Sequence, residues 1–335
     1  KMKSNKRQSN LLQMHRGFRG DDMESGDTVF KHWPEIENSY HRRFVTDFVN
    51  QYPELKDEMF VITEKIHGSN MQWFFRTNKD MLAGSRNNFL SLTGSFQGVQ
   101  ITDLVDAHRD LLVSVQKLTD RTYITVRLFG ELFGRGVQKG VEYGPERRIL
   151  YFGMMINDIL ISFAELERII PAAYLVPVVG KVVGLEAALE FDTRFDSLIL
   201  GTPNNICEGV VIQPYTKVYL DVHGNPFILK KKNPEFAEKK QAQRQPHTTE
   251  DPEVERLKAE LLSYITENRL ESVFSKHGRI TSPNQIGDYI RLLLADAKED
   301  FLKDFGPDFA ALNKEQQKNV CKVGGNIMNL LKNYL

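Results

Sequence analysis

The sequence predicts an α+β fold, in which a mainly antiparallel-sheet domain is followed by a small all-helical C-terminal domain. Two observations support this prediction. Between about residues 60 and 232, short runs of β-branched and aromatic residues alternate with polar turns. After a polar stretch at 233–252 that contains three prolines, apolar residues recur only at helical spacing. Strands grouped before helices are typical of α+β proteins or of separate domains.

We expect three segments along the chain. Residues 1–28 are predicted to be a flexible basic tail, because the first 20 residues contain six lysines and arginines and no acid. Such a tail is a disordered arm, a segment added for expression or what remains of a mitochondrial targeting sequence, and we favour the first. Residues 29–245 are expected to form the sheet-containing domain, and residues 246–335 the helical domain.

The strand predictions rest on apolar runs with β-branched or aromatic residues and, at 121–129, on alternation along the strand. The predicted strands span residues 59–66, 71–76, 121–129, 149–156, 209–213 and 227–232. Helical spacing within the same domain is best at 99–118 and 163–170.

In the C-terminal part, helix starts are marked by their capping residues. One helix is predicted to start at Asp251 and Pro252, and a second at the capping box SPNQ of residues 282–285. The second carries a long apolar face and is expected to end at Gly306. A last helix is predicted from about Lys314 to Leu330.

Composition excludes several classes of protein. Lysine plus arginine equals aspartate plus glutamate, 44 each, so a nucleic-acid surface must be a local patch. The two cysteines, Cys207 and Cys321, rule out a disulfide framework and a cysteine-based zinc cluster. No apolar run approaches the roughly 18 residues of a membrane helix, so we expect a soluble intracellular protein whose compartment stays open between cytoplasm, nucleus and mitochondrion.

The run Lys65-Ile66-His67-Gly68 contains the first candidate for chemistry. A neutral lysine amine can attack the α-phosphate of a nucleotide and hold the nucleotide as a phosphoramidate. The spacing of lysine and glycine alone is unspecific, and a surface strand end explains it equally well. Its context is more informative, because Lys65 ends a strongly apolar strand and precedes a polar turn.

Four further elements follow in order. Glu131 comes directly after an apolar run, Phe152 lies within a predicted strand, and Glu208 stands at a strand start. Lys230 and Lys232 end the last strand on one face, because side chains alternate along a strand, whereas Lys231 points away. Taken singly, Phe152 is a core aromatic, the two acids are solvated strand ends and the lysines belong to a solvated linker. The ordered set argues for a phosphate-binding site.

These five elements, in this order, resemble the covalent nucleotidyltransferase superfamily of polynucleotide ligases and mRNA capping enzymes. The most similar branch is the phage RNA ligase 2 family, which includes the kinetoplastid RNA-editing ligases. The resemblance runs from about residue 30 to 335. The segments that carry it are EKIHGSN at 64–70, FGE at 129–131, VQKGVEYG at 137–144, EG at 208–209, KKKN at 230–233, FAEKK at 236–240, NR at 268–269 and SKHG at 275–278.

The resemblance implies an ATP-dependent RNA ligase with Mg²⁺, which seals 3′-hydroxyl and 5′-phosphate RNA ends through a lysyl-AMP. By matching position, Lys65 is the nucleophile and Glu208 organises Mg²⁺. The remaining implied roles are Glu64 at the adenine edge, Ile66 at the nucleotide, His67 and Asn70 on the phosphate and metal side, Arg86 at the AMP phosphate, Glu131 at the ribose, Phe152 stacked on adenine, and Lys230 and Lys232 at the transferring phosphate.

The sequence departs from the family pattern at three places. Ser69 stands where the family usually has threonine, which keeps the hydroxyl. Gly153 stands where an acid often follows the stacking aromatic. Gly94 lies in a stretch without a counterpart.

Other functions remain as alternatives. A DNA ligase or an mRNA guanylyltransferase would follow the last strand with an OB-fold barrel, whereas this tail is helical. An inactive RNA-binding scaffold would be expected to have lost the nucleophile or the acids. For the ligase, the partner is RNA, with a nicked duplex preferred, and a repair or editing complex would add protein partners. The tail cations Arg269, Lys276, His277, Arg279 and Arg291 are expected to meet its phosphates.

Overall fold

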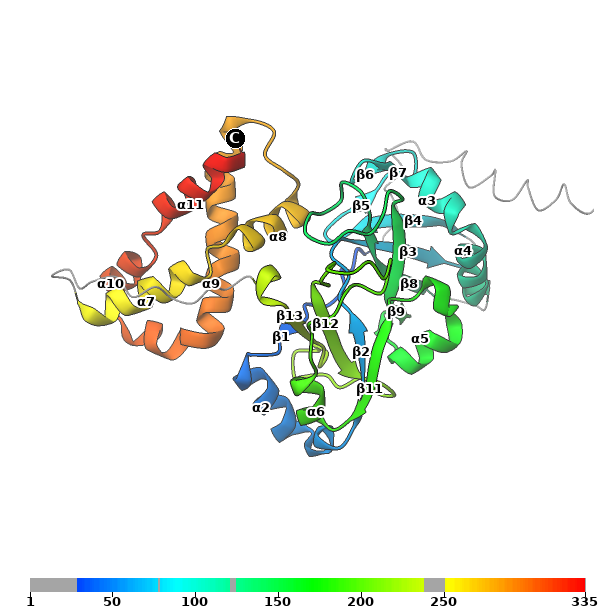
Figure 1. Cartoon of the computed structure of the whole chain (residues 1–335), viewed down its shortest axis with the longest axis horizontal. Coiled ribbons are helices and arrows are strands. Elements are labelled where there is room, and N and C mark those ends of the chain that lie inside the picture. Colours follow the sequence, from blue (N-terminus) through cyan, green and yellow to red (C-terminus); the bar gives the residue numbers. More distant parts are fainter. Residues whose placement is uncertain (1–28, 78, 121–124, 238–250, 335) are drawn as a thin grey trace, which may run out of the picture. The chain divides into compact units, whose positions relative to one another are not determined.

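The computed structural model describes residues 29–77, 79–120, 125–237 and 251–334. These residues form two compact units that divide between Asn233 and Pro234, the larger containing the sheets and the smaller only helices (Figure 1). The α+β prediction is therefore confirmed. The predicted tail at 1–28 and the predicted boundary at 245 lie outside the described residues.

The first sheet of the larger unit has five strands. All neighbours pair antiparallel except β1 and β13, which are parallel. In sheet order the strands are β1 (Glu37–Asn38), β13 (Leu229–Lys232), β12 (Gly209–Pro214), β2 (Met59–Glu64) and β11 (Val178–Val183). Phe60 and Ile62 of β2 point into a buried core shared with α2 (Arg42–Gln51) and α6 (Leu185–Glu190). Burying one face of the sheet in this way fixes the direction of every second side chain.

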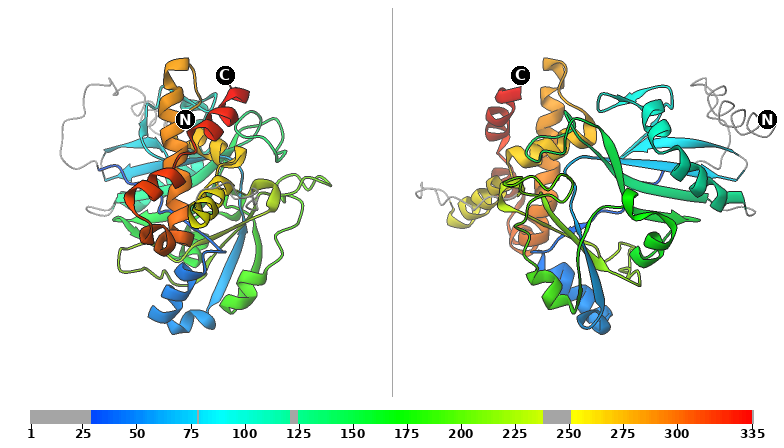
Figure 2. Two further views of the ribbon diagram at one scale, coloured as in Figure 1. Left: turned by 90° about the vertical axis from the view of Figure 1, so that its left-hand side faces the viewer. Right: turned by 45° about the vertical axis from the view of Figure 1, so that its right-hand side comes forward.

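The second sheet has six antiparallel strands. In order they are β10 (Ile159–Leu160), β9 (Arg148–Ile156), β8 (Thr125–Phe133), β3 (Ser69–Arg76), β4 (Lys79–Ser85) and β5 (Phe89–Leu90). Its outer face is covered by α3 (Ile101–Ala107), α4 (Arg109–Gln116) and α5 (Phe163–Ile169), as Figure 2 shows. On that face Trp73 donates a hydrogen bond to the Tyr151 hydroxyl at 2.9 Å. A small hairpin, β6 (Ser95–Phe96) and β7 (Val99–Gln100), precedes α3.

The strand predictions agree with the structure apart from shifts at their ends, and residues 121–124 of one of them are outside the described part. The helical stretch predicted at 99–118 is helical from residue 101 to 116 but is divided into α3 and α4 at His108, whose Nδ1 lies 2.9 Å from the carbonyl oxygen of Leu104. Strands β4 and β11 were not predicted, and neither were the two-residue strands β1, β5, β6, β7 and β10. Strand β4 contains Asp80 and Gly84, residue types with low strand propensity, and forms because it pairs with β3.

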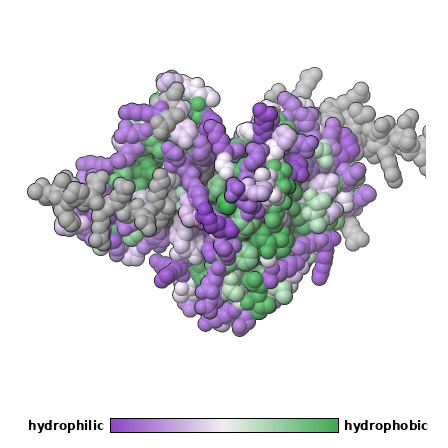
Figure 3. Space-filling view, viewed as in Figure 1, coloured by the Kyte–Doolittle hydropathy of each residue, from purple (hydrophilic) through white to green (hydrophobic). Residues whose placement is uncertain are grey.

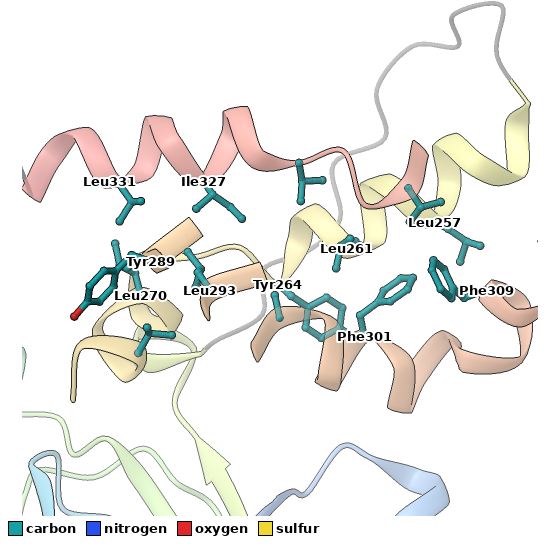
Figure 4. Close-up of a cluster of buried hydrophobic side chains, with 14 of the residues drawn as sticks. Leu257, Leu261, Tyr264, Leu270, Tyr289, Leu293, Phe301, Phe309, Ile327 and Leu331 are labelled. Carbon is teal, nitrogen blue, oxygen red and sulfur yellow. The ribbon is translucent and has the colours of Figure 1, made fainter. Parts of the chain in front are cut away.

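The smaller unit packs its helices around one apolar core, seen in Figure 4. Its helices are α7 (Pro252–Ser263), α8 (Glu267–His277), α9 (Ile286–Ala311), α10 (Lys314–Val320) and α11 (Gly324–Leu331). Both predicted helix starts are confirmed: Asp251 caps α7, and the Ser282 capping box opens the turn before α9. Leu261, Leu293 and Ile327 are fully buried where the helices meet.

Two predicted helix ends in this unit are wrong. Helix α9 continues through Gly306 to Ala311, because Phe309, only 7% exposed, packs into the core beyond the glycine. That burial outweighs the approximately 1 kcal/mol that a glycine costs within a helix. The last predicted helix is two helices, α10 and α11, and Gly324 and Gly325, which have low helix propensity, follow the break.

Arg269 does not offer its charge to solvent. Its guanidinium is 1% exposed and forms ion pairs with Asp296 at 2.6 Å and Asp300 at 2.8 Å. It therefore links α8 to α9, and its expected contact with RNA phosphates is a correction to the sequence analysis. Lys276, Arg279 and Arg291 also pair with acids of the same unit.

Among the described residues, no helix combines the length and apolar character needed to cross a bilayer. Hydrophobic surface is visible in Figure 3 over the part of the larger unit where β9 and β11 lie. The edge strand β11 contributes Val178 and Val183, which are 37% and 65% exposed.

Candidate active site

Three neighbouring strands of the five-stranded sheet bring the first catalytic candidates together. Strand β12 lies between β2 and β13, and Gly209 at its start pairs with Lys232 at the end of β13. On the other side, the amide of Lys65, which follows β2, donates to the Gly209 carbonyl at 2.9 Å. Lys65, Glu208 and Lys232 therefore meet at one end of these three strands, although Lys65 and Lys232 are 167 positions apart in the sequence.

Glu208 is the centre of this group. Its carboxylate is 2% exposed and receives Lys65 Nζ at 3.0 Å and Lys232 Nζ at 2.9 Å, with His67 Nδ1 at 3.2 Å. Burial acts to raise the pKa of Glu208, but the charges of Lys232, Lys65 and His67 hold it well below its usual range. The carboxylate thus stays ionised, and the side chains of Lys65, Lys232 and His67 gather around it.

The loop after Lys65 is held against the second sheet. A Cβ on Gly68 would lie 2.2 Å from the carbonyl oxygen of Leu132, so only glycine permits this approach to β8. The His67 amide donates to the Tyr143 hydroxyl at 2.8 Å. Tyr143 is 5% exposed and belongs to the segment VQKGVEYG, which braces the loop.

The second sheet adds Asn70, Glu131 and Arg86. Asn70 at the start of β3 is the cross-strand partner of Glu131 in β8, and Arg86 directly follows β4. Desolvation raises the pKa of Glu131 to about 7, while the positive charges of Lys65, His67 and Arg86 oppose this shift and Glu208 adds to it. The four charges act on Glu131 because both sheets deliver their side chains to one place.

Phe152 occupies an irregular position in β9. Phe129 of β8 pairs with Gly153 and Gly130 pairs with Tyr151, which leaves Phe152 as the extra residue of a β-bulge. Its ring packs against a cluster of Trp33, Phe129, Met155 and Ile228 between the two sheets. The cluster also receives Val211, the partner of Lys230, so the aromatic lies beside the strands that carry the charged group.

Glu64 and Ile66 are more buried than their implied roles require. The Glu64 carboxylate is 1% exposed and accepts hydrogen bonds from Ser197 Oγ at 2.6 Å and from the Leu198 amide at 2.8 Å. Desolvation raises the pKa of Glu64, and these two hydrogen bonds partly offset the rise. Ile66 is 3% exposed. These two buried side chains, on either side of Lys65 in the sequence, anchor this part of the chain.

Strand β13 has the alternation that the sequence predicts. Lys232 reaches Glu208, and Lys230, on the same face, is paired with Val211 across the ladder. Lys231 points to the opposite face, where its Nζ donates to the carbonyl oxygens of Leu189 at 2.7 Å and Phe191 at 2.8 Å. These carbonyls lie at the C-terminal end of α6, so Lys231 caps that helix.

Comparison with known proteins gives the family. A family model described as RNA ligase matches residues 58–232, more than half of the chain. The chain belongs to the RNA ligase family. A second model, described as T4 RNA ligase 2 C-terminal, matches residues 248–329, in the helical part of this family member.

Similar solved structures include RNA ligases of Naegleria gruberi. A lysine-to-methionine mutant with AMP and Mn is 16% identical with a TM-score of 0.47, and the match covers 64% of this chain and 59% of that one. A glutamate-to-alanine mutant with ATP and Mn is 19% identical with a TM-score of 0.44, covering 64% and 58%. The RNA ligase family member described here thus spans less than two thirds of the length of these chains.

Every predicted site residue of this RNA ligase family member lies within the matched residues 58–232. Sequence reasoning missed the residues that position them. Tyr143 and Asn233 lie in segments that carry the resemblance, so their motifs were the available signal; the Asn233 amide donates to the Glu208 carbonyl at 2.9 Å. Ser197 had no sequence signal, and neither had Trp33, which precedes the matched region.

Proposed function

We propose that this chain is an ATP-dependent RNA ligase that forms lysyl-AMP on Lys65 and seals RNA ends, with nicks in duplex RNA as its preferred substrate. The observation that supports this proposal most strongly is the buried Glu208 carboxylate, which holds Lys65, Lys232 and His67 together. A lysine nucleophile surrounded by further cations suits attack on a polyphosphate, where charge stabilisation supplies most of the catalysis.

The reaction divides into three transfers. The neutral amine of Lys65 attacks the α-phosphorus of ATP; a P–N bond forms, the bond to the β-phosphate oxygen breaks, and pyrophosphate leaves. A 5′-phosphate oxygen of the RNA then attacks the same phosphorus and releases the lysine. Finally the 3′-hydroxyl attacks the RNA 5′-phosphorus and expels AMP. Because an ammonium is not nucleophilic, the ion pair between Lys65 and Glu208 must open before the first step.

The available oxygen donors fit Mg²⁺. Glu208 supplies a carboxylate, and Asn70 Oδ1 is buried without a hydrogen-bonding partner among the described residues. Hard divalent cations prefer such oxygen ligands. When bound, Mg²⁺ would neutralise charge on the triphosphate. Lys230 and Lys232 would hold the transferring phosphate, and Glu131 would accept hydrogen bonds from the ribose.

Covalent labelling tests the proposal. Wild-type protein incubated with α-labelled ATP and Mg²⁺ should retain label after denaturation. Lys65→Ala should abolish the label, and so should Lys65→Arg, because a guanidinium stays protonated. Label that persists in either variant would contradict the assignment of Lys65. Equal labelling from GTP would indicate a guanylyltransferase, and absence of wild-type label an inactive scaffold.

Substrate comparison tests the finer part. Nicked duplex RNA should be sealed faster than single-stranded RNA or nicked DNA, because A-form RNA presents its 2′-hydroxyls in a wide, shallow groove. Faster sealing of nicked DNA would instead indicate a DNA ligase.

A further inference from the structure

Trp33 fills the space that Gly153 leaves open. A Cβ on Gly153 would lie 2.1 Å from Cη2 and 2.2 Å from Cζ3 of the Trp33 indole, so no larger residue fits at position 153 while Trp33 is in place. Trp33 itself is 5% exposed. The absence of the acid that often follows the stacking aromatic therefore has a physical reason, because an indole occupies the site of its side chain.

The same indole sets the position of Phe152. The two rings meet edge to face, with centroids 5.1 Å apart and planes at 73°. Trp33 also contacts Phe129, 5.2 Å away in β8, and packs in one cluster with Ile228, which directly precedes β13 of the other sheet. As the extra residue of a bulge, Phe152 has no direct cross-strand partner in the ladder, so neighbouring side chains must fix its orientation.

We propose that Trp33 is a positioning residue for the nucleotide base, which holds the Phe152 ring in place and closes this side of the base site with an apolar wall instead of a carboxylate. This inference rests on the proposed function, in which Phe152 stacks on adenine. It assigns a role in nucleotide recognition to a residue that lies outside the region matched to the family. The base is then selected here by stacking and shape.

The experiment separates base recognition from phosphate recognition. In a Lys65→Ala background, which prevents covalent transfer, dissociation constants are measured for ATP and for ribose 5′-triphosphate, which has no base. Trp33→Leu should weaken ATP binding about three- to tenfold, the size expected from the loss of one aromatic contact. Binding of ribose 5′-triphosphate should change less than about twofold, since no stacking is lost. Trp33→Phe keeps an aromatic ring, so its affinity for ATP should lie between that of Trp33→Leu and that of the Lys65→Ala parent.

A double-mutant cycle identifies the route of the effect. If Trp33 acts through Phe152, Trp33→Leu combined with Phe152→Leu should bind ATP no more weakly than Phe152→Leu alone. Trp73→Phe is the matched control, because Trp73, the only other tryptophan, is buried on the opposite face of the same sheet. It should lower thermal stability and leave the ratio of the two dissociation constants unchanged.

Three outcomes overturn the inference: equal effects of Trp33→Leu on both ligands, additive effects of the Trp33 and Phe152 substitutions, or an unchanged affinity for ATP. Failure of the proposed function is recognised separately. Absence of covalent label on the wild-type protein would reject the ligase reaction. The base site would still stand if the Lys65→Ala protein bound ATP more tightly than ribose 5′-triphosphate and if Trp33→Leu reduced that preference.

Discussion

Glu208 shows how one side chain can organise a site of opposite charge. Replacing Glu208 by Gln keeps its shape and removes the charge that balances Lys65 and Lys232. We expect covalent labelling to fall at least about 100-fold, because the two lysines lose their common anchor. Unfolding free energy should fall by about 3 kcal/mol, the lower end for breaking a buried ion pair, since Lys65 and Lys232 are 19% and 15% exposed.

Labelling and chemical denaturation measure the two effects. The matched control is Glu58→Gln, which breaks a Glu–Lys pair at 2.7 Å with Lys217, 59% exposed. It should lower the unfolding free energy less than Glu208→Gln does, because Lys217 is exposed to solvent, and it should leave labelling intact. Normal labelling by Glu208→Gln would show that the carboxylate does not organise the site.

Glu131 gives a prediction for pH dependence. Its folded-state pKa is raised to about 7 from 4.5, chiefly by desolvation, so the folded protein binds this proton more tightly than the unfolded chain. The resulting stabilisation is present below pH 4.5 and is lost as pH rises toward 7. Glu208, with a lowered pKa, loses its contribution only at pH values below 4.5. The pKa of Glu64 is also raised, but Glu64 is present in both the wild type and Glu131→Gln, so the comparison of these two proteins isolates Glu131.

Thermal unfolding without nucleotide tests this. The melting temperature of the wild type relative to Glu131→Gln should decline between pH 5 and 7, because only the wild type must ionise a partly desolvated carboxylate as the pH rises. Parallel curves for the two proteins across this range would be the contrary result.

At the scale of the element, β13 places Lys231 on one face and, on the other, Lys230 and Lys232, which we propose hold the transferring phosphate. Lys230→Ala and Lys232→Ala should each strongly impair covalent labelling with Mg²⁺ and ATP, because the transferring phosphate loses a counter-charge. Lys231→Ala should label almost normally. It should lower the unfolding free energy by about 1 kcal/mol, because the carbonyls of Leu189 and Phe191 at the end of α6 lose their donor.

Thermal melts and initial labelling rates on the three variants make this comparison. The outcome expected for Lys231 differs from that for a plain solvated lysine, which would change neither property. A labelling defect in Lys231→Ala as large as those of its neighbours would mean that the strand face is assigned wrongly.

At the scale of the whole molecule, each unit has a core of its own. The larger unit buries Phe60 and Trp73 in its sheets, and the smaller unit buries Leu261 and Leu293 between its helices. All the site residues lie in the first unit. A protein that ends at Gln245 should therefore still form lysyl-AMP, whereas we expect it to seal nicked RNA poorly because it lacks the helical unit that we propose clamps the duplex.

Circular dichroism first establishes that the truncated protein is folded, and labelling and nick sealing are then measured on the same sample. Unchanged sealing, or equal loss of both activities in a folded protein, removes the clamp. The exposed surface of the helical unit, rather than buried Arg269, is where RNA contacts must be sought. Arg269→Ala should destabilise that unit, because the buried Asp300 carboxylate would lose the Arg269 guanidinium while its contact with Lys303 at 3.3 Å remains.

The sequence by itself determined the α+β order, six of the strands, among them β2, β12 and β13, and the residues that gather in the site. Alternation along β13 follows from the backbone alone, so the opposite directions of Lys231 and Lys232 were predictable. Motif wording identified Lys65, Glu131 and Glu208 as a set. The ends of α9 and the division between α3 and α4 were not predictable, because local propensity competes there with burial against distant residues.

Only the tertiary structure decided how the site is held. That Glu208 receives Lys65 and Lys232 on one carboxylate depends on the order of β2, β12 and β13 in the sheet, which no local pattern encodes. Likewise, the sequence shows Gly153 only as a departure from the family pattern. The structure explains the departure, because Trp33, 120 positions earlier, fills the space that a side chain at position 153 would need. Side-chain chemistry and periodicity are local properties of a sequence, whereas close packing is settled between segments that meet only in the folded chain.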